Sequence, residues 1–157
     1  MVFRNPSSLT ELYSAFNILK PLSELYPDFN NWYWDKVVPG IINGSDKMIL
    51  AENKSGLVGI SIVKDSFAEK KLRALRISDK YQRKGYGLYL IDESLKQLGS
   101  SKPVVSVAEE MINDYSRIFI NRYDFDMTHV YKGLYRKDKL EYEFNGLKNL
   151  NNKSVYF

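Results

Sequence analysis

Apolar residues near the start of the chain recur every three or four positions, as they do on one face of a helix. Ser8 and Glu11 have the form of a capping box, in which two side chains satisfy free amides at a helix start. We therefore expect a first helix to begin here and to end at Pro21 or Pro27. The periodic positions are Leu9, Leu12, Tyr13, Phe16 and Leu19.

A second helix is expected from about residue 30 to residue 38, with Asp28 as its cap and Pro39-Gly40 closing it. This segment is strongly aromatic. Its rings favour core packing, with the wall of a pocket as the alternative. They are Phe29, Trp32, Tyr33 and Trp34.

Strand patterns follow. Residues 48–52 and 57–63 are apolar or alternating runs around the turn 53–56, which predicts a hairpin. Residues 70–77 predict a third strand. Alternation places Lys71, Arg73, Leu75 and Ile77 on one face of it, and Leu72, Ala74 and Arg76 on the other.

The second half of the chain predicts a helix after residue 87, with Gly99 as its C-terminal cap and an Asp92–Lys96 pair on its wet face. Its apolar face is Leu88, Ile91, Leu95 and Leu98. A buried strand at 104–107, a helix at 113–122 and strands at 125–135 and 139–144 follow.

This order of elements predicts a mixed α/β fold built around one strand–turn–helix–strand crossover. The chain has 157 residues, about the size of one domain. We assign residues 1–146 to that domain and 147–157 to a C-terminal tail.

Composition narrows the function classes. The chain has no cysteine, which excludes disulfides, cysteine nucleophiles and cysteine-based zinc sites, and we expect no metal. No apolar run approaches the roughly 20 residues of a membrane span, so a soluble, cytoplasmic protein without a membrane partner is expected. The net charge of +4 and pI near 9.1 favour anionic partners such as a nucleotide-like cofactor, and leave RNA open.

The most informative stretch is Gln82-Arg83-Lys84-Gly85-Tyr86-Gly87, between a predicted strand and a predicted helix. Amides at such a turn point outward together, and the helix start adds partial positive charge, which suits a pyrophosphate. The turn lacks the third glycine of a Rossmann motif and the lysine pattern of a P-loop. The alternative is a helix start that needs a flexible backbone.

Residues 75–87 resemble the central motif of the GCN5-related N-acetyltransferase (GNAT) family. That motif has Arg or Gln, then Gly three positions later and Gly or Ala two further on, after a strand of the form L-x-V. Gln82, Gly85 and Gly87 match in register, as do Leu75 and Ile77 upstream. The order of elements also resembles that family along nearly the whole chain.

The resemblance implies a twisted mixed sheet of about six to seven strands flanked by about four helices, and acetyl-CoA as acetyl donor. It implies that backbone amides of Gln82, Arg83, Lys84, Gly85, Tyr86, Gly87 and Leu88 hold the coenzyme A pyrophosphate. It further implies that Leu75, Arg76 and Ile77 hold the acetyl and pantetheine groups. The implied reaction is direct transfer of acetyl to a primary amine within a ternary complex.

A second family segment matches at Asn113, which we assign to the cofactor site, and at Phe125. The tyrosine that protonates the leaving thiolate in the family falls at Ile120, and Asp124 replaces a glycine. The Ile120 departure motivates a second reading, a non-catalytic acyl-CoA-binding sensor. The alternative thiolate acids are Tyr115, Tyr123, Tyr131 and Tyr142.

Transfer to an amine is helped by a general base. Glu109 and Glu110 follow the buried strand, and two adjacent carboxylates can raise one pKa toward neutrality, so we assign this catalytic role to them. The alternative is a solvated turn. His129 is the only histidine, and we expect it to be structural.

The acceptor is open among a small-molecule amine, a protein amine and an aminoacyl-tRNA. We expect it to bind near residues 29–34 and the Glu109-Glu110 turn. A homodimer is a further hypothesis, with the strand at 139–144 as the candidate edge.

Overall fold

The computed structural model describes residues 1–147, so the predicted tail, apart from its first residue, lies outside the described residues. A seven-stranded mixed sheet runs in the order β1-β2-β3-β4-β5-β7-β6. Its strands are β1 (Val2–Arg4), β2 (Asp46–Asn53), β3 (Gly56–Asp65), β4 (Lys70–Ile77), β5 (Val104–Ala108), β6 (Met127–Lys132) and β7 (Leu140–Phe144).

Helices cover both faces of this sheet. The α-helices are α1 (Leu9–Leu19), α2 (Phe29–Trp32), α3 (Val38–Asn43), α4 (Tyr86–Leu98) and α5 (Ile112–Arg117). The short helices are 3-10 (η1, Lys20–Glu24; η3, Asp79–Tyr81) or π (η2, Tyr33–Val37; η4, Ile118–Arg122). The predicted mixed α/β architecture is confirmed, and β1 is an addition to it.

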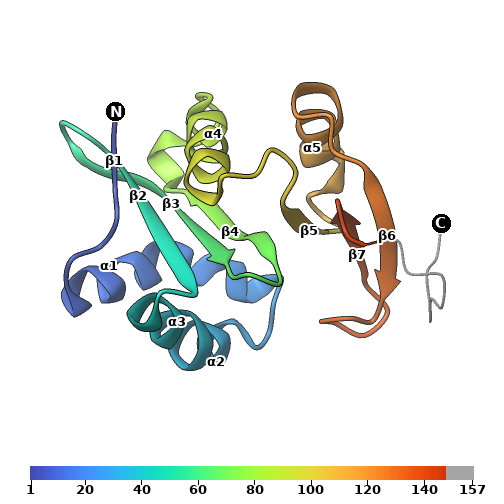
Figure 1. Cartoon of the computed structure of the whole chain (residues 1–157), viewed down its shortest axis with the longest axis horizontal. Helices are drawn as coiled ribbons and strands as arrows, with labels where there is room; N and C mark the ends of the chain where they lie inside the picture. The colour runs from blue at the N-terminus through green and yellow to red at the C-terminus, as the bar shows by residue number, and fades with distance from the viewer. Residues whose placement is uncertain (148–157) are drawn as a thin grey trace.

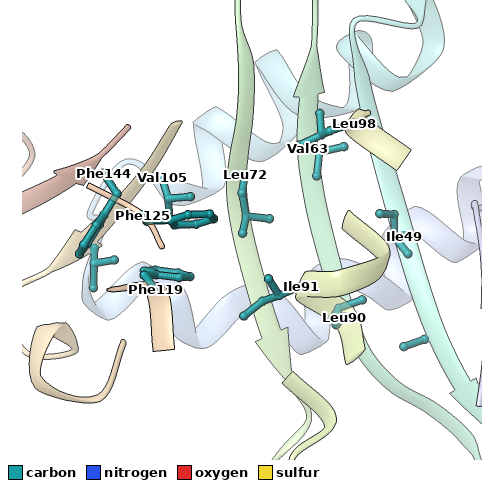
Figure 2. Close-up of a cluster of buried hydrophobic side chains, with 12 residues drawn as sticks. Ile49, Val63, Leu72, Leu90, Ile91, Leu98, Val105, Phe119, Phe125 and Phe144 are labelled. Atoms are coloured by element: carbon teal, nitrogen blue, oxygen red, sulfur yellow. The ribbon is translucent and has the colours of Figure 1, made fainter. Parts of the chain in front are cut away.

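The two faces have separate cores. Figure 1 shows α1, α2 and α3 below the sheet and α4 and α5 above it. On the α4 side, Leu72 lies between a group of aromatic rings from the C-terminal half and Ile91 of α4 (Figure 2). The opposite core packs α1, α2 and η2 against β2 and β3 through buried residues such as Leu19, Tyr33 and Ile60.

The first helix begins as predicted, because the Ser8 hydroxyl accepts a 3.3 Å hydrogen bond from the Glu11 amide. The α-helix ends at Leu19, two residues before Pro21, and the helical segment that continues it ends at Glu24, before Pro27, as predicted. α1 passes directly into η1, and Pro21 lies in the first turn of η1. Proline is tolerated there because the N–H that it lacks would have no partner within the helix.

The predicted end of the second helix at Pro39-Gly40 is wrong. α2, η2 and α3 run without a break to Asn43, and Gly44, with φ of +88°, forms the left-handed C-cap. Gly40 serves packing instead, because a Cβ there would overlap the Asp46 carboxylate.

The predicted alternation along β4 is also wrong. Val63 pairs with Leu72 and Ile62 with Ala74, so Arg73 is the extra residue of a β-bulge. The bulge reverses the pattern after it. Leu72, Leu75 and Ile77 consequently share one core, while Ala74 packs in the other.

β4 and β5 are parallel neighbours for only two residue pairs, of which Leu72–Val105 is the last. Beyond it the strands diverge, and β5 pairs with β7 on its other side. The bulge at Arg73 lies directly where the divergence begins, and bulges bend the strand that carries them. The C-terminal ends of β4 and β5 therefore form the two sides of an opening in the sheet.

Two further expectations change. β7 lies between β5 and β6, so the edge at this end of the sheet is β6 and not the strand at 139–144. Asp92 faces Tyr123, whose hydroxyl donates a 2.6 Å hydrogen bond to it, and Arg122 at 3.7 Å, in place of the expected Lys96. Within the described residues, no helix is long and apolar enough to span a bilayer.

Candidate active site

Two cavities meet at the opening between β4 and β5. The larger, about 280 Å³, is lined by residues of β4 and β5 and by the N-terminal helical segment. The smaller, about 250 Å³, lies at the start of α4. Leu75, Ile91 and Tyr115 line both cavities, so the two spaces adjoin across the diverging strands.

The turn between β4 and α4 is held by its own polar side chains. The Gln82 amide nitrogen donates to the Ile77 carbonyl at 2.9 Å and to the Asp79 carboxylate at 3.3 Å. Arg76 pairs with the same carboxylate at 2.8 Å. Gln82 and Arg76 therefore tie the end of β4 to the turn, and their side chains fix the backbone that leads into α4.

The turn then presents a bare helix start. Gly85 is the N-cap of α4 with φ of +83°, a region that favours glycine, and no side chain caps the helix. The first amides of a helix have no partner within it. A 13-residue helix without a side-chain cap therefore offers free N–H groups and partial positive charge toward the smaller cavity.

Gly87 has no conformational reason to be glycine. It lies inside α4 with φ outside the left-handed region, and the nearest atom to a Cβ there would be Ile77 Cγ1 at 4.0 Å. It lines the smaller cavity together with Gly85 and Leu88. The absence of a side chain thus keeps the helix start open to a ligand.

The other residues predicted for cofactor binding lie around this opening. Arg83, with φ of +62°, and Lys84 are exposed. The Tyr86 ring packs edge-on against Tyr81. Asn113 is exposed on α5 and lines neither cavity, so the structure does not bring it together with the others.

Among the tyrosines proposed as thiolate acids, Tyr115 is the one at the junction of the cavities. Burial raises its pKa. Tyr123 instead binds Asp92 and the Leu88 carbonyl, and burial raises its pKa to about 12. Tyr131 and Tyr142 line neither cavity, and the Ile120 side chain is exposed.

Glu109 and Glu110 lie at the end of β5 but line neither cavity. Arg136 binds both carboxylate oxygens of Glu110, at 2.8 and 2.7 Å, and lowers its pKa to about 2. The expected elevation is therefore wrong for Glu110, because the cation outweighs its acidic neighbour. Glu109 accepts a 3.1 Å hydrogen bond from the Leu140 amide.

A carboxylate that the sequence pattern did not single out, Glu141, is 4% exposed and lines the larger cavity. The Tyr26 hydroxyl donates a 2.7 Å hydrogen bond to it, and burial raises its pKa. An available signal was the run Leu140 to Phe144, where glutamates alternate with apolar residues. Such alternation ordinarily places the glutamates in solvent, and for Glu141 the packing of Tyr26 against its carboxylate reverses this.

The aromatic residues of 29–34 serve both of the expected roles, the wall of a pocket and core packing. Phe29 and Trp32 line the larger cavity. Tyr33 is fully buried and its hydroxyl donates to the Leu12 carbonyl at 2.6 Å, which makes it part of the core, and Trp34 packs beside it. His129 is buried against Glu143 at 2.9 Å, away from both cavities.

The fold is similar to that of known structures. An acetyltransferase of the GNAT family from Desulfovibrio desulfuricans aligns with a TM-score of 0.71 and 15% identity, over 91% of this chain and 96% of that one. The ribosomal-protein-alanine N-acetyltransferase of Brucella melitensis aligns with a TM-score of 0.70 and 13% identity, over 92% and 98%. A GNAT acetyltransferase of Elizabethkingia anophelis, solved with acetyl-CoA bound, aligns with a TM-score of 0.65 and 14% identity, over 91% and 95%.

In sequence comparison, no family model and no curated protein matches the chain. The structural alignments nevertheless cover nearly all of both chains. The chain has the fold of the GNAT acetyltransferases.

Proposed function

We propose that this protein is an acetyl-CoA-dependent N-acetyltransferase that moves the acetyl group directly to a primary amine in a ternary complex. One observation carries the proposal. The uncapped start of α4, kept open by Gly87, leads through a cavity into the opening between β4 and β5, where a second cavity begins. One space suits the donor and the adjoining space suits the acceptor.

The donor side follows from the helix start. The α4 amides would hold the pyrophosphate, and exposed Arg83 and Lys84 would add positive charge at its rim. The pantetheine part of acetyl-CoA would then run along β4 past Leu75 toward the larger cavity. Acetyl-CoA supplies an acyl group activated as a thioester, and its solved complex with a protein of the same fold supports this choice.

Tyr115 is proposed as the acid that protonates the departing thiolate, because it lines both cavities. The alternative of a non-catalytic sensor was motivated by the isoleucine at position 120, where the family has a tyrosine. If Tyr115 supplies the acid instead, that motivation no longer applies. The base role of Glu109 and Glu110 remains a prediction, and their replacement by Gln tests it. A small-molecule, protein or RNA-borne amine would each satisfy this reaction, and the cytoplasmic location and the dimer stay predictions.

The test of the donor site is Gly87→Val, with Tyr89→Val as matched control. Tyr89 is exposed on the same helix, so both variants place a valine near the start of α4, and only Gly87→Val places it against the smaller cavity. We expect calorimetry to show at least a tenfold loss of acetyl-CoA affinity for Gly87→Val alone, with unfolding curves of both variants close to the wild type. Equal affinity in the two variants would refute the site.

A further inference from the structure

Glu141 lies on the β5 side of the opening between β4 and β5. In the sheet register it pairs with Ala108, the last residue of β5 and three residues beyond the final β4–β5 pair. Leu75 lies three residues beyond the same pair on β4. The buried carboxylate and the junction of the two cavities therefore face one opening from its opposite sides.

Glu141 lacks a cation of its own. Arg136 and Lys71 both lower its pKa through their charge, but Arg136 commits its guanidinium to Glu110 through two hydrogen bonds. Within residues 1–147 no Lys or Arg forms an ion pair with Glu141, and its polar contact is the Tyr26 hydroxyl. Buried charges are ordinarily paired, so this carboxylate is left to pair with something that enters the cavity.

The remaining walls are apolar and aromatic. Tyr26 and Tyr135 meet edge-to-face at 5.3 Å beside Glu141. The surface around them comes from both halves of the chain and includes Leu22, Leu25, Phe29, Trp32, Met111 and Phe119. Such a surface binds the body of a ligand by burying apolar area, and it leaves one place for a charged group.

The other charged residues of the cavity do not suit a second ammonium. Arg73 is held by Asp46 at 2.8 Å and stacks over Trp32 at 5.0 Å, and Lys71 also lines the cavity. Arg73 therefore has Asp46 as its counter-ion, and among residues 1–147 neither Arg73 nor Lys71 forms an ion pair with Glu141. A polycation would bring additional positive charge close to Arg73 and Lys71.

We propose that the acceptor is a small monoamine with an apolar body, whose ammonium group pairs with Glu141 and gives its proton to that carboxylate. This rests on the proposed function. The Glu141 carboxylate takes one proton from the ammonium, and the neutral amine attacks the acetyl carbonyl carbon. The C–N bond forms, the C–S bond breaks, Tyr115 gives its proton to the thiolate and takes the second nitrogen proton in its place, and Glu141 later releases its proton to water.

Burial suits Glu141 to this step, because it raises the carboxyl pKa and so brings it nearer to the pKa of the amine. Tyr26 positions the carboxylate through its hydrogen bond. The cavity volume of about 280 Å³ admits a compact body.

The first test is an acceptor panel under saturating acetyl-CoA, with thiol release as readout. The chain has no cysteine, so the protein contributes no thiol background. The panel compares 2-phenylethylamine and hexylamine with spermidine, kanamycin, a peptide with N-terminal alanine and a lysine peptide. We expect kcat/KM for the two apolar monoamines to exceed all others at least tenfold.

The second test is Glu141→Gln, with Glu143→Gln as control on the same strand and the same face of it. Glu143 binds His129 and lines neither cavity. For 2-phenylethylamine at pH 7 we expect Glu141→Gln to lower kcat/KM about 10²-fold. The loss of kcat/KM in Glu141→Gln should become smaller as pH approaches the pKa of the free amine, because the amine then needs no base. Glu141→Asp should recover part of the rate.

Several outcomes would overturn this inference. One is preference for spermidine, kanamycin or a peptide. The others are equal losses in Glu141→Gln and Glu143→Gln, or a deficit that does not change with pH. If acetyl-CoA is bound and the polyamine is acetylated, the proposed function stands and the monoamine inference fails. If acetyl-CoA is not bound at all, the proposed function itself fails.

Discussion

The hydroxyl of Tyr26 donates a 2.7 Å hydrogen bond to Oε1 of Glu141, across 115 positions of sequence. It joins the segment between η1 and α2 to a strand of the C-terminal half. The contact closes one end of the larger cavity and places its buried carboxylate. The first two predictions follow from it.

Tyr26→Phe should destabilise the fold by about 1–3 kcal/mol, because the buried carboxylate loses a hydrogen bond to its charged form. The ring contact with Tyr135 is kept. Since the hydrogen bond lowers the pKa of Glu141, its loss should raise that pKa further. Urea unfolding and the pH dependence of turnover measure the two effects, and no change in either would contradict the contact.

Glu141→Gln should leave the protein as stable as the wild type at low pH and more stable at neutral pH. Burial raises the pKa of Glu141, so its contribution to stability is present below the unfolded pKa near 4 and is lost as pH rises through the folded pKa. Gln stays neutral throughout. Urea unfolding from pH 4 to 8 should show the variant's advantage growing with pH, and an advantage that shrinks would refute the sign.

Glu110→Gln should behave in the opposite way. Arg136 lowers the pKa of Glu110 to about 2, so its contribution is present above the unfolded pKa and is lost as pH falls toward 2. The pair is partly exposed, so we expect a loss of at most about 1 kcal/mol at pH 7. Urea unfolding of the variant and the wild type at pH 7 and pH 2 measures this loss of stability. A loss that is as large at pH 2 as at pH 7 would count against the Glu110–Arg136 pair.

Gly40→Ala should destabilise the fold although alanine is the better helix former. The gain in helix propensity is about 1 kcal/mol. The new Cβ would displace the Asp46 carboxylate from its buried pair with Arg73, and breaking such a pair costs about 3–5 kcal/mol. The expected net loss is about 2–4 kcal/mol in urea unfolding.

The control for Gly40 is Ile42→Ala on the same helix. Ile42 is 77% exposed, so its truncation should stay within about 0.5 kcal/mol of the wild type. A loss in Gly40→Ala no larger than that of the control would show that the Asp46 approach is not tight.

Tyr115→Phe should lower kcat about 10²-fold and leave acetyl-CoA affinity unchanged, because the lost hydroxyl acts on the departing thiolate. Tyr123→Phe is the comparison, since Tyr123 binds Asp92 on α4 and lines neither cavity. Stopped-flow turnover with calorimetric binding separates the two parameters. Equal kcat in Tyr115→Phe and the wild type would remove Tyr115 from the reaction.

Local patterns in this chain predicted local structure well. The hairpin of β2 and β3, the amphipathic α4 with Gly99 as its left-handed cap, and the glycine turn before it all lie where the sequence places them. Each depends on residues within a few positions of one another. Side-chain periodicity and the φ freedom of glycine are properties of such short windows.

The errors arose where a contact with another element overrode the pattern within one element. Gly40 was interpreted as a helix end, but it lies within α3 to accommodate Asp46. Arg73 was expected to alternate with its neighbours, but the pairing of β4 with β3 makes it a bulge. In both cases the partner belongs to a different element of the fold, so periodicity within one element could not reveal it.

The sequence by itself determined the class of fold and the turn for an anionic ligand, because both are written in neighbouring residues. Only the tertiary structure decided which carboxylate and which tyrosine reach the opening in the sheet. Glu141 reaches the opening because β7 pairs with β5, Tyr115 reaches it because α5 packs against β5, and Tyr26 covers Glu141 from the other end of the chain. Burial and the raised pKa of Glu141 exist only once these segments have packed together.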